Sequence, residues 1–173
     1  MADKSGAIAG GGIGVFQRLG NKFGLVKSID QKLHLLKRHL PYHESDHVLN
    51  IAYNTLLGGE RLEDIELRRT DEVFLDAIGA DRIPDPTTSG DFTRRFTEKN
   101  IGQLMVCINE ARGRVWDVQG KGFLEEALID IDGTIAETLG ECKQGMEMSY
   151  KGIWGYAPLI VSDRKSNRLT YSH

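Results

Sequence analysis

Cysteine is scarce in this chain, since only Cys107 and Cys142 occur and no CxxC pair is present. This usage indicates neither a zinc knuckle nor a disulfide framework, and it favours a reducing cytoplasm. Long apolar runs are also lacking, because glycines interrupt the one from Ala7 to Phe16 well short of the roughly 18–20 residues that span a bilayer. No signal-peptide cleavage motif follows that run. We therefore expect a cytoplasmic protein without a membrane segment.

Neither sign of charge dominates, with 22 Lys and Arg against 25 Asp and Glu. A length of 173 residues fits one domain, or one domain with a small extension. The charge is unevenly distributed along the chain. Residues 1–42 carry seven basic and two acidic side chains, whereas residues 43–83 carry four basic and ten acidic side chains. A basic N-terminal stretch is able to contact phosphates, although a solvated face without a partner explains it equally well.

Apolar residues at helical spacing predict that roughly the first two thirds of the chain is helical. Two helices are expected between residues 13 and 40, broken near Gly20 and Gly24. The next helix is expected to be capped by Ser45 or Asp46 and to stop at a pair of glycines.

Capping residues and prolines separate the later helices. Short helices are expected within residues 62–79, the second capped by Thr70. The segment Ile-Pro-Asp-Pro-Thr-Thr-Ser-Gly at residues 83–90 predicts a turn, because each proline disfavours helix before it. The candidates to cap the helix that follows are Thr87, Thr88 and Ser89.

The pattern changes after a long helix expected from about Ile101 to Trp116. The short apolar run of residues 127–132 predicts a buried strand that ends in acids, and a second strand is expected within residues 150–161. Residues 163–173 lose this apolar character, so we expect a polar tail that does not extend a sheet. The predicted fold class is α+β.

Residues 43–47, His-Glu-Ser-Asp-His, match the HExxH pattern, in which two histidines hold zinc and the glutamate acts as base. Pro41 places this segment at a helix start, and the charged Asp46 is unusual between zinc ligands. Glu63 and Glu66 are candidates for a third ligand by spacing alone. A capped helix N-terminus with exposed histidines explains the segment better.

Asp130 and Asp132 end the predicted strand, and the alternation of side chains places both carboxylates on one side of it. The run Leu128–Thr134 resembles the first motif of haloacid-dehalogenase-like phosphatases, where the first Asp is the nucleophile and the second the acid/base. That motif usually opens its fold, and here the sequence after Thr134 is too short for that fold. A purely structural strand end is the alternative.

Thr88, Arg94 and Arg95 form a third group, on the helix expected after the proline-rich turn. An exposed helix N-terminus and two cations are able to contact phosphate groups. Arginine pairs on helices are also commonly just solvated, so both interpretations stay open.

Several segments resemble one family when they are taken in order. In the first part of the chain these are residues 40–49, 57–59, 62–65, 86–87, 91–92 and 94–96. They are similar to the N-terminal part of bacterial insertion-sequence DDE transposases. In the second part, Asp130–Thr134, Tyr150–Gly152 and Gly155–Leu159 resemble the opening of that family's ribonuclease-H-like catalytic core. The resemblance runs from about Gly10 to Ser162.

The resemblance implies binding to DNA at transposon terminal inverted repeats, with a homodimer or an association with full-length transposase. The family cuts and joins phosphodiesters with two Mg²⁺ or Mn²⁺ ions held by two Asp and one Glu. The resemblance makes Asp132 the first catalytic and metal-ligating carboxylate, with Asp130 as a neighbour. The residues implied to contact nucleic acid are Thr88, Arg94, Arg95 and Lys151. The resemblance also assigns the HExxH segment to a helical region.

The other two carboxylates of that pattern are expected farther downstream than Asp132. The polar residues from 163 onward begin where apolar strand sequence would continue, so we expect a transposase truncated or frameshifted after about Ser162. The expected domains are a helical N-terminal region at 1–122, the first strands of an incomplete ribonuclease-H-like α/β core at 123–162, and a non-family tail at 163–173. Such a chain is expected to lack strand transfer by itself. A DNA-binding module, a decay product without function, and the phosphatase are the open alternatives.

Overall fold

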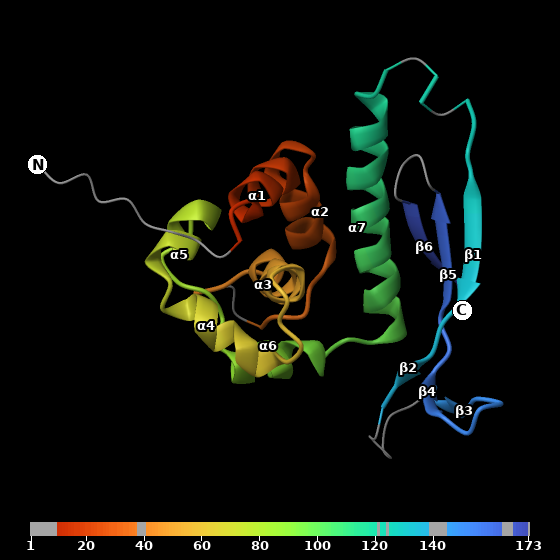
Figure 1. Ribbon diagram of the computed structural model, residues 1–173. Coiled ribbons are helices and arrows are strands. Elements are labelled where there is room, and N and C mark those ends of the chain that lie inside the picture. The colour runs from red at the N-terminus through yellow and green to blue at the C-terminus, as the bar shows by residue number, and fades with distance from the viewer. Residues whose placement is uncertain are drawn as a thin grey trace, which may run out of the picture. The chain divides into compact units, whose positions relative to one another are not determined.

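The computed structural model describes residues 10–37, 41–120, 122–123, 125–138, 145–163 and 168–172, with side chains up to Ser162. The chain divides into two compact units, Met1–Val118 and Gln119–His173. The first unit is helical and the second consists of strands and turns (Figure 1). This mixture of helices and small antiparallel sheets is consistent with the predicted α+β class. In the described part of the chain, no helix combines the length and apolar character needed to cross a membrane.

The helices of the first unit follow one another through short connections. They are α1 (Ile13–Lys22), α2 (Leu25–Lys32), α3 (Glu44–Leu56), the 3₁₀ turn η1 (Leu62–Ile65), α4 (Glu66–Arg69), α5 (Glu72–Ile78), α6 (Pro86–Thr93) and α7 (Glu98–Asp117). The predicted break between the first two helices lies at Gly24, whose φ of 70° suits glycine. Gly20 lies inside α1 and does not interrupt it. Leu40, where the second helix was expected to end, lies outside the described residues.

The predicted N-caps of three helices were wrong, because His43 is the N-cap of α3 and aspartates cap the other two helices. Asp46 is the third residue of α3, and its carboxylate accepts a hydrogen bond from the His43 amide at 2.8 Å. Asp71 caps α5, and Asp85 caps α6 by accepting from the Thr88 amide at 2.8 Å. The helices therefore begin one to three residues away from the caps expected at Ser45 or Asp46, at Thr70, and at Thr87, Thr88 or Ser89.

Two apolar clusters hold the helical unit together. The first joins α1, α3, η1 and α5 through the buried residues Ile13, Tyr53, Ile65, Phe74 and Ile83. The second joins α2, α6 and α7 through the buried residues Ile29, Leu33, Phe92 and Cys107. Helix α3 contributes to both clusters, since Tyr53 belongs to the first and the half-buried Val48 packs against the second.

Among the residues that the structure describes, the second unit forms two three-stranded antiparallel sheets. Their strands are β1 (Ile129–Gly133), β2 (Ala136–Glu137), β3 (Glu147–Met148), β4 (Trp154–Tyr156), β5 (Leu159–Asp163) and β6 (Arg168–Ser172). The order is β1-β5-β6 in one sheet and β2-β4-β3 in the other. The region 150–161 therefore contributes to two strands in different sheets.

Two strand predictions were wrong. β1 was expected to be buried, yet all five of its residues are exposed, since the described part of this unit contains no helix to cover the sheet. Residues 163–173 were expected not to extend a sheet, whereas Arg168–Ser172 pairs with β5 in antiparallel register. Backbone hydrogen bonds form the ladder, so a polar sequence can join the edge of a sheet.

Candidate nucleic-acid interface

The loop after α2 is fixed by a buried carboxylate. Leu33 adopts an extended conformation at the end of α2 and is fully buried. Glu44 is 1% exposed, and its Oε1 accepts hydrogen bonds from the amides of Leu35 at 3.0 Å and Leu36 at 3.1 Å. A short loop that would otherwise leave two amides unpaired is thereby held in one conformation.

The start of α3 is tied to α2 by a second carboxylate. Asp30 accepts hydrogen bonds from the Ser45 amide at 2.9 Å and from the Ser45 hydroxyl at 3.0 Å. Negative charge at a helix N-terminus is favourable, because the first amides point toward it. Asp30 and Glu44 together position the two segments that face each other across the candidate site.

Hydrogen bonds from a side chain of α3 hold the start of α6. The Asn50 side-chain amide donates to the Pro84 carbonyl at 2.9 Å and to the Ser89 hydroxyl at 3.3 Å. Asp85 accepts from both the amide and the hydroxyl of Thr88, and these hydrogen bonds hold the pKa of the Asp85 carboxyl below its usual value. The helix N-terminus that was expected to be open to phosphate is therefore capped by a carboxylate.

The structure separates the two predicted arginines. Arg94 is the C-cap of α6, where it pairs with Asp91, and its side chain is largely exposed. Arg95 lies one residue beyond and donates to the Leu35 carbonyl at 3.3 Å. Arg95 therefore reaches the loop that Glu44 fixes, whereas Arg94 is engaged on its own helix.

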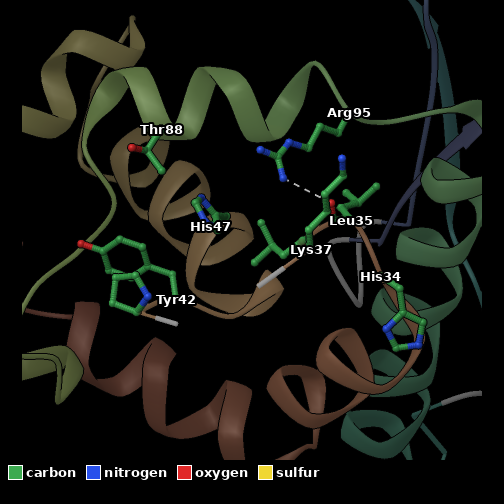
Figure 2. A pocket seen from close by; sticks show the side chains of 9 residues that line it. His34, Leu35, Lys37, Tyr42, His47, Thr88 and Arg95 are labelled. Atoms are coloured by element: carbon green, nitrogen blue, oxygen red, sulfur yellow. Dashed lines mark hydrogen bonds between the residues drawn. The ribbon is translucent and has the colours of Figure 1, made fainter. Parts of the chain in front are cut away.

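These segments line an open hollow of about 680 Å³, which we call the basic hollow. It is lined by His34, Leu35, Leu36, Lys37, Pro41, Tyr42, His47, Thr88 and Arg95. None of these described residues is Asp or Glu, although acidic residues outnumber basic ones in the chain as a whole. Figure 2 shows Thr88 and Arg95 on one side, with His47 between them and the dashed hydrogen bond from Arg95 to Leu35. The lining is therefore suited to an anion.

His47 lies at the wall of the basic hollow and is 2% exposed. Its ring stacks on Phe92 with centroids 4.4 Å apart and meets the edge of Tyr42 at 5.7 Å. Burial is the main cause that lowers the pKa of His47, and the nearby Arg95 charge acts in the same direction. The expectation that the histidines of this segment are exposed was wrong for His47, because the aromatic packing turns it inward.

The HExxH segment is a helix start and not a cluster of ligands. The Glu44 carboxylate is engaged by the loop amides, and His43 precedes the helix that contains His47. Throughout the described ranges, no three His, Cys, Asp or Glu side chains lie close enough together to hold a metal ion. The zinc interpretation therefore has no geometric support in the described residues.

The second unit carries the remaining predicted site residues. Asp130 and Asp132 are exposed and lie two positions apart on β1, opposite Ser162 and Ile160 of β5. Lys151 is exposed, with its ammonium 5.4 Å from the ring centroid of Tyr150. Carboxylate oxygens suit Mg²⁺, but the described residues add no third acidic ligand to the pair, so they do not make up a two-metal centre by themselves.

Sequence reasoning missed most of the basic hollow. Of the nine lining residues, only Thr88 and Arg95 were expected to contact nucleic acid. His34 and Lys37 fall in the basic N-terminal stretch, so the charge distribution was the available signal. Comparisons of the chain with family models, with curated proteins and with solved structures find no match.

Proposed function

We propose that this chain is a DNA-binding protein of the insertion-sequence DDE transposase type, whose helical unit contacts the DNA backbone at the basic hollow. The observation that carries the proposal is the composition of the lining. Lys37 and Arg95 come from segments far apart in sequence, share one hollow with Thr88, and have no acidic neighbour in the lining. Phosphate contacts require local positive charge of this kind and not a basic chain overall.

The second unit carries Asp132, to which the transposase interpretation assigns metal binding. In the transposase interpretation Asp132 is the first carboxylate that holds Mg²⁺ or Mn²⁺, and exposed Asp132 on an accessible strand is compatible with that role. A bound ion would supply charge stabilisation at the attacked phosphate. Asp132 is the only member of the carboxylate set that we assign, so the activity proposed for this chain is DNA binding and not strand transfer.

Terminal inverted repeats are the proposed DNA partner, and a homodimer or an association with full-length transposase is the proposed assembly. The test uses fluorescence anisotropy with labelled duplexes taken from the DNA on either side of the coding sequence. A shuffled duplex of the same composition is the control. We expect affinity to fall steeply with salt and to favour the flanking duplexes. Equal, salt-insensitive affinity for both duplexes, or no binding, would exclude this function.

Hydrolysis of small phosphate esters tests the alternative interpretation, in which Asp130 and Asp132 belong to a phosphatase. Metal-dependent release of phosphate from para-nitrophenyl phosphate, lost in Asp130→Asn, would favour that enzyme class over a transposase. We expect no such release from the purified chain.

A further inference from the structure

The imidazole of His47, at the wall of the basic hollow, is held in one orientation although one of its nitrogens has no hydrogen-bond partner among the described residues. His47 is held between the face of Phe92 and the edge of Tyr42, so its ring orientation is fixed. Its Nδ1 is buried and has no hydrogen-bond partner among the residues that the structure describes. A buried polar atom of this kind costs stability unless a further group satisfies it.

Each of the three acids near His47 accepts a hydrogen bond from another group. The Glu44 Oε1 accepts from the loop amides, Asp46 accepts from the His43 amide, and Asp85 accepts from Thr88. Each of these carboxylates still favours the charged imidazole electrostatically, while burial and Arg95 oppose it. The positive charge of Arg95 is therefore one of the factors that oppose protonation of His47.

The cations of the basic hollow are not neutralised by acids. Neither Lys37 nor Arg95 forms an ion pair with a carboxylate of the described residues, and Arg95 is held only by the Leu35 carbonyl. An anion that enters the hollow would meet both cations and would offset the field of Arg95 at the imidazole. It would also add negative charge beside a ring whose orientation is already fixed (Figure 2).

We propose that the basic hollow binds one phosphate group and that a proton is taken up on His47 as the phosphate binds. This inference rests on the proposed function, because a DNA phosphodiester is the phosphate that the hollow is expected to meet. Reciprocity requires that an anion which favours the imidazolium also binds more tightly when His47 is protonated. DNA affinity should therefore rise as pH falls below 6.5, an effect that the DNA itself does not cause, since a phosphodiester does not titrate between pH 5 and 8.

The first experiment follows the imidazole resonances of His47 by NMR from pH 5 to 8, without and with saturating sulfate. Sulfate is a phosphate mimic whose charge is constant in this range, and a short DNA duplex is the second probe. We expect each probe to move the midpoint of the His47 titration upward by about half a pH unit, which corresponds to roughly threefold tighter binding at the low-pH end. A midpoint that stays in place at saturation with both probes overturns the proposal.

Two variants separate His47 from other titrating groups. His47→Phe retains a ring against Phe92, and it should bind sulfate and DNA with no pH dependence beyond that of the buffer controls. His43→Asn is the matched control, because His43 lies one helical turn away and outside the lining of the hollow. It should retain the wild-type pH dependence. Loss of the dependence in His43→Asn, with a normal His47 titration, would overturn the assignment to His47.

The two probes also distinguish this proposal from the proposed function. DNA binding without any sulfate or duplex effect on His47 would refute the phosphate site and leave DNA binding in place. Sulfate binding with an upward shift of the His47 midpoint, but no DNA binding, would support the phosphate site for a free anion and refute the DNA-binding function.

Discussion

The Glu44 carboxylate accepts a hydrogen bond from the Leu35 amide at 3.0 Å, and it does so from a position almost completely removed from solvent. The same Leu35 offers its carbonyl to Arg95 at 3.3 Å. Leu35 is therefore held at its amide by Glu44 of α3 and at its carbonyl by Arg95, which follows α6. The shape of the basic hollow depends on this pair of contacts.

Removal of the Glu44 carboxylate should destabilise the helical unit. Glu44→Ala leaves the Leu35 and Leu36 amides without their acceptor, and we expect a loss of about 2 to 3 kcal/mol in the free energy of unfolding. Glu44→Gln retains an oxygen acceptor and should lose less. Chemical denaturation of the purified variants measures both values. Equal stability of Glu44→Ala and the wild type would show that the loop does not depend on this carboxylate.

The correction of the α5 cap can be tested by a pair of neighbouring variants. Asp71 accepts from the Val73 and Phe74 amides, each at 3.0 Å. Asp71→Ala should therefore lower stability by about 1 kcal/mol. Thr70→Ala is the control and should change stability by a few tenths of a kcal/mol at most, since Asp71 and not Thr70 caps the helix. A larger loss in Thr70→Ala than in Asp71→Ala, seen in thermal or urea denaturation, contradicts the assignment.

Stability should depend on pH through His47. Its pKa in the folded chain is lowered by burial from the ordinary value of 6.5, so the unfolded chain binds the proton more readily. The stabilisation is therefore complete above pH 6.5 and is lost as pH falls from there toward the lower folded pKa. Urea midpoints measured between pH 5 and 8 should decline on the acid side, and His47→Phe should show a shallower decline. An identical pH profile for both proteins would rule out His47 as the source.

DNA binding should not depend on the acidic strand or on divalent metal. Asp132 is exposed on β1 in the second unit, whereas the basic hollow belongs to the first. Asp132→Asn and the addition of EDTA should therefore each leave the DNA dissociation constant within about twofold of the wild type, at matched ionic strength. A tenfold weakening by either change, measured by anisotropy, would place Asp132 or its metal in the DNA contact.

The sequence predicted the helical unit well where a glycine or a regular apolar spacing marked a helix. Gly79, with a φ of 70°, ends α5 as expected, and apolar periodicity located the long helix α7. The caps were misassigned because several polar residues stood next to each other, and only geometry shows which carboxylate faces the first amides. At α6 the candidates lie two to four positions after Asp85, which is the residue that caps the helix.

The basic hollow was predictable only in part, because it is assembled from segments that no local pattern connects. Arg95 and Thr88 were identified together from one expected helix, although α6 ends at Thr93, before Arg95. Lys37 lies 58 positions before Arg95 in the chain. His47 was considered as a metal ligand because its spacing from His43 suits one. Its packing against Phe92 depends on a residue from another helix, so the sequence alone could not reveal that it is buried.

The most direct test of the account compares the salt dependence of DNA binding in two variants of adjacent arginines. Arg95 lines the basic hollow, whereas Arg94 pairs with Asp91 and lies outside the lining. Arg95→Ala should reduce the slope of log affinity against log salt by about one and weaken binding, because one phosphate contact is lost. Arg94→Ala should leave the slope near that of the wild type. Equal slopes for wild type and Arg95→Ala, with a reduced slope for Arg94→Ala, would contradict the assignment of the hollow as the DNA contact.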